Sequence, residues 1–392
     1  MNRNKAGEEF DSPERKPWFG GRFFRVITVL VAFLLVLAGW GAVFDPSTYW
    51  YIALIGLGFP VLFITNLFFL ILWILRGRKF TWVPLAALLI TVVKLPVILQ
   101  WGGTNEKPDF VEGQSEEISM MSFNVRLFDL YNWTNSHQTK AKIFDLFEYN
   151  NPKILCIQEF YSGSRKNQDN VQAINSFMNY RAVHAEFPIT LYGTEYFGIA
   201  TFSAFPIVYK GVLYIDNTTA NMCIYTDIKI HKDTIRVYNC HLQSVRFEEK
   251  EYKFLESISN DEEDQPSGEE AAKSTRNILS RLKAAFIKRA KQVDLISQHI
   301  ANSPYPVVIC GDFNDTPISY TYESISKNML DAFRESGSGL GSTYAGPIPG
   351  LRIDYILHSP RISSYDFSIG KMKISDHYPL SATLVIKNPE NN

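Results

Sequence analysis

The side chains best suited to chemistry lie just after short apolar runs, where strands are expected to end. The clearest case is Val307 to Asp315, in which Val-Val-Ile-Cys-Gly leads into Asp312 and Asn314. A buried strand that ends in this way can deliver two polar side chains into a site, but Gly, Asp and Asn are also common in ordinary turns. The choice depends on whether other strand ends carry matching chemistry.

Five other expected strands also carry polar residues at or near their ends. These residues are Asn124, Glu159, His241, Asp354, Asp376 and His377. Carboxylates and amides without a cluster of His and Cys suit a hard cation such as Mg²⁺ or Mn²⁺ better than Zn²⁺. Neither a Gly-x-Ser-x-Gly motif nor a setting for a reactive Cys is found. The set therefore predicts metal-assisted attack of water on a phosphoester, with a carboxylate for the water and histidines for the phosphate oxygens.

Seven short motifs in the same part of the chain resemble the endonuclease/exonuclease/phosphatase superfamily. This family includes exonuclease III, pancreatic-type deoxyribonuclease, neutral sphingomyelinases and inositol polyphosphate 5-phosphatases. The motifs follow the family's order and run from residue 122 to residue 379, so the resemblance covers the region 118 to 386. They are Ser-Phe-Asn-Val-Arg at 122–126, Ile-Gln-Glu at 157–159, Gly-Ile-Ala-Thr-Phe-Ser-Ala-Phe-Pro-Ile at 198–207, Asn-Cys-His-Leu at 239–242, Gly-Asp-Phe-Asn-Asp at 311–315, Arg-Ile-Asp-Tyr-Ile at 352–356 and Ser-Asp-His-Tyr-Pro at 375–379.

The resemblance implies a metal site formed by three of these residues. Glu159 is similar to the family's principal Mg²⁺ ligand, and Asn124 to the amide that contacts the metal or the phosphate. Asp376 is similar to a carboxylate that binds or orients a metal. Asn124 has a simpler interpretation as a cap at a strand end. Arg126, two residues further on, is interpreted as a surface residue.

The resemblance also implies the groups that act on the substrate. Asp312 is similar to the carboxylate that orients or deprotonates the attacking water, and Asn314 to the amide that holds the phosphate. His377 resembles the histidine that binds the scissile phosphate, with Asp354 as the partner that fixes its ring. His241 resembles a second histidine of the deoxyribonuclease and sphingomyelinase branches. Asp354 and His241 have simpler interpretations as a hydrogen-bonded core carboxylate and a core histidine.

The elements that must position these residues alternate from residue 117 onward. Strands are expected near 117–124, 154–159, 197–203, 207–214, 221–230, 234–242, 307–310, 352–358 and 380–386, and helices near 136–150, 168–178 and 273–301. This order favours two sheets flanked by helices. The resemblance implies an α/β fold, a four-layer α/β/β/α sandwich of two mainly antiparallel sheets, in a domain at 118–388.

The first hundred residues have a different character. Three apolar runs, at about 24–44, 49–75 and 80–101, are each long enough to cross ~30 Å of hydrocarbon. We therefore expect a cytoplasmic tail at 1–22, three transmembrane helices within 23–101 and a linker at 102–117. Arg76-Gly77-Arg78-Lys79 follows the second run, whereas the turn at 45–47 has no Lys or Arg. The positive-inside rule then predicts a cytoplasmic N-terminus and an extracytoplasmic catalytic domain.

Composition limits the remaining choices. Residues 105–392 hold more Asp and Glu than Lys and Arg, which argues against a high-affinity nucleic-acid binder unless a bound metal supplies positive charge. The acidic segment 260–270 is expected to be disordered. The cysteines are interpreted as buried thiols rather than metal ligands, with a disulfide across a hairpin as the alternative for two of them. They are Cys156, Cys223, Cys240 and Cys310.

Together these features predict a membrane-anchored, Mg²⁺-dependent phosphoesterase of phosphodiesterase or nuclease type, with Mn²⁺ as a possible substitute. Nucleic acid, a phospholipid head group and a phosphorylated small molecule such as an inositol phosphate remain alternative substrates. An inactive, membrane-tethered binding domain of the same fold is the alternative from another class. The presence of Glu159, Asp312 and His377 argues against it. The predicted partners are the substrate and, through the N-terminal helices, the lipid bilayer; no protein partner is inferred.

Overall fold

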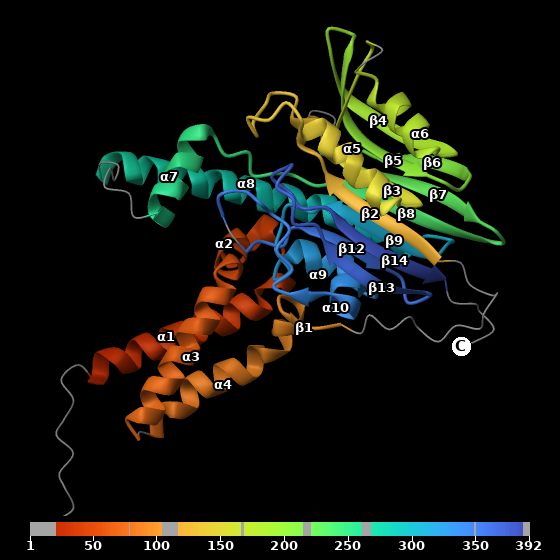
Figure 1. Cartoon of the computed structure of the whole chain (residues 1–392). Helices are drawn as coiled ribbons and strands as arrows, with labels where there is room; N and C mark the ends of the chain where they lie inside the picture. Colours follow the sequence, from red (N-terminus) through yellow and green to blue (C-terminus); the bar gives the residue numbers. More distant parts are fainter. Residues whose placement is uncertain are drawn as a thin grey trace, which may run out of the picture.

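The protein consists of an N-terminal helical bundle joined to an α/β sandwich (Figure 1). The computed structural model describes residues 21–77, 79–103, 117–165, 168–214, 221–260, 268–348 and 350–386. Most of the expected tail, most of the expected linker and residues 261–267 of the acidic segment lie outside the described residues. The same holds for 387–388, the expected end of the domain.

The first sheet has six strands in the order β13-β14-β2-β3-β5-β4. β2 and β3 run parallel, and the other neighbours are antiparallel. The strands are β2 (Glu117–Asn124), β3 (Ile154–Gly163), β4 (Ala182–Leu191), β5 (Glu195–Ser203), β13 (Ile362–Ile369) and β14 (Leu380–Ile386). The edge strands β4 and β13 are additions to the strands expected from the sequence.

The second sheet has six strands in the order β10-β12-β9-β8-β7-β6. β8 and β9 run parallel, and the other neighbours are antiparallel. The strands are β6 (Ile207–Leu213), β7 (Met222–Ile230), β8 (Asp233–His241), β9 (Val307–Asp312), β10 (Leu330–Asp331) and β12 (Asp354–His358). Cys223 and Cys240 face each other across β7 and β8 as free thiols, and all four cysteines are buried.

The two sheets stack face to face, with helices on both outer faces (Figure 1). Apolar side chains such as Cys156, Ile235 and Val308 fill the space between the sheets. Helices α5 (Thr139–Asn150) and α6 (Asn170–Met178) pack on the first sheet through Ile143, Phe147 and Ile174. The long helix α8 (Gly268–Ala301) and the short helix α9 (Tyr320–Ser326) pack on the second sheet. The predicted four-layer sandwich is confirmed.

The shorter elements connect these layers. Helix α7 (Glu249–Asn260) precedes α8, and α10 (Ala332–Ser336) follows β10. Strand β1 (Gln100–Trp101) pairs with β11 (Ser338–Gly339), which ties the end of the helical bundle to the sandwich.

Within the described residues, the bundle contains two helical stretches that are long and apolar enough to cross a membrane, or three if a bent pair is counted as one span. The first is α1 (Gly21–Trp40) with a 3₁₀ turn at Gly41–Val43, and the second is Lys79–Val97, which includes α4 (Trp82–Thr91). The expected second run is divided between α2 (Pro46–Leu57) and α3 (Phe59–Leu75), which are bent by 53°. Gly58 and Pro60 lie at the break, where proline lacks the N–H that would continue the helix.

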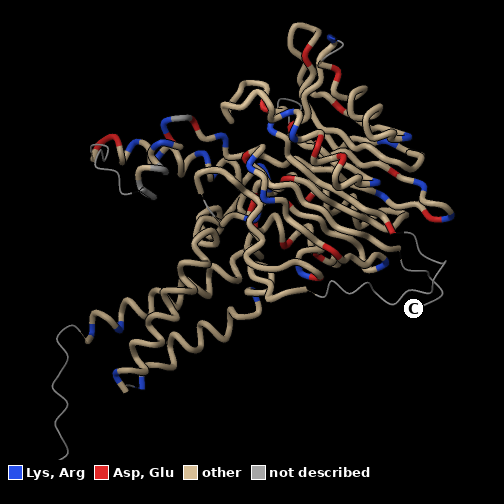
Figure 2. Tube along the Cα trace, in the orientation of Figure 1, with Lys and Arg blue, Asp and Glu red and all other residues tan. Residues whose placement is uncertain are grey.

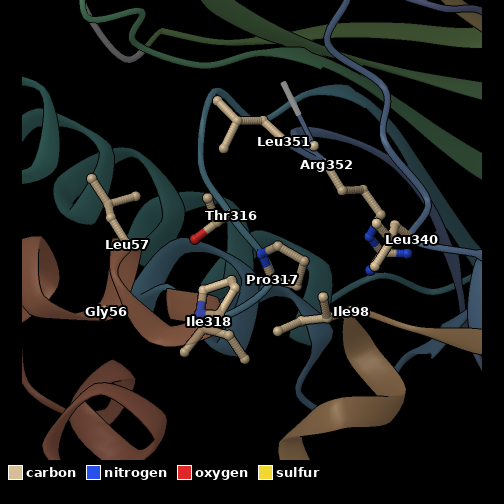
Figure 3. A pocket seen from close by; sticks show the side chains of 11 residues that line it. Gly56, Leu57, Ile98, Thr316, Pro317, Ile318, Leu340, Leu351 and Arg352 are labelled. Atoms are coloured by element: carbon tan, nitrogen blue, oxygen red, sulfur yellow. The ribbon is translucent and has the colours of Figure 1, made fainter. Parts of the chain in front are cut away.

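The bundle packs directly against the sandwich. Helix α2 lies along α8, and Lys283 of α8 places its Nζ 5.2 Å from the ring of Trp50. Nζ of Lys94 forms a 3.1 Å ion pair with Glu323 of α9. Figure 3 shows this junction, where the loop that carries Pro317 lies between α2 and Ile98, the residue after the 3₁₀ helix Val92–Val97. A small cavity of about 50 Å³ lies here.

Candidate active site

The predicted site residues come together at one end of the two sheets, where the parallel central strands end side by side. Asn124 ends β2, which is adjacent to β3 in the first sheet. His241 ends β8 and Asp312 ends β9, and the two are partners in the register of the second sheet. Nδ2 of Asn124 donates a 3.1 Å hydrogen bond to Oδ2 of Asp312, so the two sheets meet at this point.

Two backbone irregularities aim side chains into the site. β3 carries a bulge between Ile157 and Phe160, and Glu159 within it has a φ of 46°. A bulge redirects a side chain at the cost of local strain, a frequent device at functional sites. Gly311 has a φ of 127°, and a Cβ there would lie 2.0 Å from the carbonyl oxygen of Cys240. Glycine is therefore required just before the carboxylate that ends β9.

Asp312 is buried and held by neutral donors. Its Oδ1 accepts from the backbone N–H of Asn314 at 2.8 Å, and its Oδ2 accepts from Nδ2 of Asn314 at 3.0 Å and from Asn124. Nδ2 of Asn314 also donates to the carbonyl oxygen of Leu242 at 3.1 Å. In this geometry Asn314 positions Asp312, and its predicted contact with a phosphate stays a prediction.

His377 connects two carboxylates. Its Nδ1 lies 2.9 Å from Oδ2 of Asp354, and its Nε2 lies 3.6 Å from Oδ2 of Asp312. Burial by itself would lower the pKa of His377, but the charges of Asp354 and Asp312 raise it well above 6.5. The three residues place oxygen and nitrogen atoms within 4.8 Å of one another, which also suits a cation. A ring held between two carboxylates also suits proton transfer.

His241 has no hydrogen-bond partner for either ring nitrogen, although the residue is only 5% exposed. Its Nε2 lies 3.6 Å from Oδ2 of Asp312 and 3.7 Å from Oε1 of Glu159. Burial lowers the pKa of His241, while the charge of Asp312 opposes this shift. Burial also raises the pKa of Asp312 to about 6, against the opposing charge of His377. A buried polar atom without a partner is costly, so His241 is suited to meet a ligand.

Glu159 faces the open side of the site, with a side chain that is 33% exposed. Burial and the negative charge of Asp376 raise its pKa, whereas His377, a hydrogen bond from Asn124 and Arg126 lower it. Oδ2 of Asp376 lies 3.4 Å from Nε of Arg126. Glu159, Asn124 and Asp376 carry oxygen donors of the type that a hard divalent cation prefers, and their assignment as metal ligands stays a prediction.

A buried polar network supports the site from behind. Nε2 of Gln158 donates to Oδ1 of Asn239 of the second sheet at 2.6 Å and to Oγ of Ser122 of its own sheet at 3.2 Å. Nδ2 of Asn239 donates to the carbonyl oxygen of Ala200 at 2.9 Å. Gln158 immediately precedes Glu159, and Asn239 lies two residues before His241, so the network fixes the strands that carry them. Their place inside two of the family motifs is the sequence signal that could have identified them.

Two arginines were missed or misinterpreted at the sequence level. Arg126, interpreted as a surface residue, pairs with Asp376, and its guanidinium lies 4.5 Å from the ring centre of Trp133. Arg246 lines a cleft beside Glu159 and His241. Arg126 stands in the same motif as Asn124, which is a usable signal, whereas Arg246 lies in a loop whose sequence has no distinctive pattern.

A two-sheet α/β sandwich with acids, amides and histidines at one shared sheet edge defines a class of phosphoester hydrolases. The chain belongs to the endonuclease/exonuclease/phosphatase family, because the sequence pattern of that family matches residues 121–377. A domain of unknown function, DUF8431, matches residues 21–98. No curated protein sequence matches this chain.

Solved structures with a related fold are distant in sequence. An endonuclease/exonuclease/phosphatase from Beutenbergia cavernae is 14% identical, with 69% of this chain and 72% of that chain covered and a TM-score of 0.48. A family member from Bacteroides thetaiotaomicron is 16% identical, with coverages of 70% and 100% and a TM-score of 0.48. The human Nocturnin catalytic domain with bound sulfate is 17% identical, with coverages of 70% and 98% and a TM-score of 0.46. Likeness at this level leaves the substrate open.

Proposed function

We propose that this protein is a membrane-anchored, divalent-metal-dependent phosphoesterase that hydrolyses its substrate by attack of water on phosphorus. The observation that carries this proposal is the row Asp354, His377 and Asp312, which lies next to Glu159. The row provides an acid and a base that are fixed in position at the ends of the central strands. A degenerate binding domain of the same fold would have no reason to keep this costly arrangement of buried charges.

Glu159, Asn124 and Asp376 are the residues that would hold the metal, for which Mg²⁺ is the first choice and Mn²⁺ the second. The raised pKa of Glu159, caused by burial and by Asp376, supports this assignment because a bound cation would relieve both effects. When bound, the metal supplies Lewis-acid stabilisation of the negative charge on the phosphate.

The remaining side chains act on the water and on the phosphate. Asp312 orients the attacking water and accepts its proton, while the donors from Asn124 and Asn314 hold the carboxylate in place. His377, kept protonated by Asp354, donates from Nε2 to a phosphate oxygen and stabilises its developing charge. His241 contributes a second ring nitrogen on the same side of the site.

The N-terminal helices are proposed to anchor the enzyme in a membrane, with α1, α3 and α4 as the crossing helices. Helix α3 has 17 residues and is about 26 Å long, which is close to the hydrocarbon thickness. The Lys and Arg residues at the start of α1 and around the turn between α3 and α4 lie at the end of the bundle away from the sheets (Figure 2). This supports a cytoplasmic N-terminus and an extracytoplasmic domain at 118–388.

The catalytic proposal is tested with the full chain in lipid nanodiscs and bis-p-nitrophenyl phosphate as the substrate. We expect turnover with Mg²⁺, no turnover with EDTA, and a loss of about 10²–10⁴-fold in Asp312→Asn and His377→Gln. Asp366→Asn and His231→Gln are the matched controls: both positions are exposed, and His231 lies in the turn at the opposite end of β8 from His241. Equal rates in Asp312→Asn and the parent would rule out the proposed mechanism.

The orientation is tested separately in a bacterial inner membrane. Alkaline phosphatase fused to the C-terminus is expected to be active, because that enzyme works only outside the cytoplasm, and a cytoplasmic fluorescent reporter at the same position is expected to be dark. The reverse result would contradict the extracytoplasmic assignment while leaving the phosphoesterase proposal intact.

A further inference from the structure

A cleft of about 340 Å³ opens directly beside Glu159 and His241. Its size lies in the range of sites for small molecules. The polar part of its lining includes Asn221, Ser244 and Arg246. The apolar part comes from two segments, the loop after β2 and the hairpin of β4 and β5; its residues are Leu127, Tyr131, Ile189, Leu191 and Phe197.

Two of the apolar lining residues, Leu191 and Tyr131, are exposed to solvent, whereas the others pack against the core of the first sheet. Leu191 is 41% exposed and Tyr131 is 59% exposed, and Trp133 packs edge-on against Tyr131 with ring centres 5.0 Å apart. Tyr192, at the tip of the same hairpin, is 92% exposed. Single exposed apolar side chains are ordinary, but several that lie together beside one cleft mark a binding surface.

The polar part of the lining is suited to an anion. A terminal nitrogen of the Arg246 guanidinium lies 3.4 Å from Oδ1 of Asn221, which orients it beside the cleft. His241, buried and without a hydrogen-bond partner, lines the same cleft. An arginine and an imidazole next to the predicted metal ligand Glu159 can together receive the oxygens of one phosphate group.

We propose that this cleft is a subsite for the hydrocarbon part of a lipid phosphoester, with the phosphate at His241 and Arg246 and the chain along Leu127, Ile189 and Leu191. This inference rests on the proposed function and names its substrate class. The aliphatic residues of the lining favour a hydrocarbon chain.

Nucleic acid fits the cleft less well. Among the described residues that line it, Arg246 is the one Lys or Arg, whereas binding of a polynucleotide depends on several cations along the phosphate backbone. The exposed aromatic rings of Tyr131 and Trp133 can stack on bases, so a single-stranded oligonucleotide belongs in the test as a competitor.

The test uses the full chain in nanodiscs and a pair of p-nitrophenyl phosphodiesters whose second ester group is ethyl or octyl. Both release the same chromogenic phenol, so they differ only in the length of the hydrocarbon. We expect kcat/KM of the parent to be roughly 30-fold or more higher for the octyl diester, since each buried methylene favours binding. The double variant Leu191→Ser/Tyr131→Ser is expected to lower this octyl/ethyl ratio to less than about 5.

Val208→Ser is the matched control, because Val208 is 56% exposed on β6 of the other sheet, and it is expected to keep the parent's ratio. The ratio is internal to each protein, and partition of the octyl diester into the nanodiscs affects all variants equally. If the double variant is too unstable to assay, the single variant Leu191→Ser at the exposed hairpin provides the same comparison.

Each outcome decides between the two levels of the argument. Turnover of both diesters with an octyl/ethyl ratio near 1 in the parent overturns the lipid subsite and leaves the phosphoesterase proposal standing. An unchanged high ratio in the double variant also overturns it. Stronger inhibition by a single-stranded oligonucleotide than by octylphosphonate assigns the cleft to nucleic acid instead. Turnover of neither diester, with Asp312→Asn equal to the parent, overturns the proposed function itself.

Discussion

Arg289 and Asp315 form a buried ion pair, with Nε of Arg289 3.0 Å from Oδ2 of Asp315. Arg289 also donates from a terminal nitrogen to the carbonyl oxygen of Gln243 at 2.8 Å. Asp315 follows Asp312 by three residues, and Gln243 follows His241 by two. One side chain of α8 therefore holds the loops after both parallel strands of the second sheet, and α8 itself packs against α2 of the bundle.

Replacing Arg289 by Met is expected to lower the free energy of unfolding by about 3–5 kcal/mol, because Asp315 would be left as a buried charge without its partner. Chemical unfolding of the full chain in detergent, followed by tryptophan fluorescence, measures this change. Lys291→Met, at an exposed position of the same helix, is expected to change the value by less than about 0.5 kcal/mol. Asp315→Asn added to Arg289→Met should recover part of the loss; a fully additive double variant would contradict the pairing.

The pair His377 and Asp354 predicts a shift in the basic limb of the pH–rate profile. His377 must be protonated to donate to the phosphate, and the charges of Asp354 and Asp312 raise its pKa against the effect of burial. In Asp354→Asn the basic limb of kcat/KM is expected to move to lower pH, and the rate at pH 8 to fall by about 10²–10⁴-fold. The control Asp366→Asn is expected to leave the basic limb in place. If the basic limb also stays in place in Asp354→Asn, His377 is excluded as the donor.

The same pair predicts a pH dependence of stability. Because the folded-state pKa of His377 lies above the unfolded value of 6.5, its charged ring contributes stability that is fully present below pH 6.5. This contribution is lost as the pH rises through the folded-state pKa. The unfolding midpoint of the metal-free protein is therefore expected to decrease as the pH rises above 6.5, and to do so less in Asp354→Asn. Equal slopes for the two proteins would count against the pair.

Asp312 predicts the acid side of the profile. Burial raises its pKa to about 6, and only the ionised carboxylate can accept a proton from water. Below pH 6, kcat/KM is expected to fall by about tenfold per pH unit at low Mg²⁺ concentration. The sign for stability is opposite to that of an ordinary Asp: between pH 3.8 and 6 the folded state binds more protons than the unfolded state, so this group makes the protein less stable as the pH rises. A flat profile from pH 7 to pH 5 would exclude Asp312 as the base.

Metal binding has a readout that does not depend on turnover. If Glu159 is the main ligand, Mg²⁺ at about 100 times its dissociation constant should stabilise the parent by about 2.7 kcal/mol relative to EDTA, and should stabilise Glu159→Gln far less. Thermal unfolding with and without Mg²⁺ measures the difference. Glu186→Gln, a partly exposed glutamate of β4, is the control and should retain the full shift. The same shift in Glu159→Gln as in the parent would place the metal elsewhere.

The sequence by itself determined the central strands and the residues at their ends. β2, β3, β8 and β9 are buried on both faces, so their apolar runs are nearly continuous and easy to identify. The missed strands β4 and β13 are the two edges of the first sheet and are partly exposed. Edge strands carry a weaker apolar pattern, because half of their surroundings is solvent.

Only the tertiary structure decided how distant segments meet. The contact of Arg126 with Asp376, the hydrogen bond of Gln158 to Asn239 and the packing of α2 on α8 each join residues far apart in the chain. The local sequence pattern indicates which segments form strands and helices, but contacts between the sheets depend on how the layers stack. The sequence thus fixes which residues stand at the strand ends, and the stacking of the two sheets decides which of them touch.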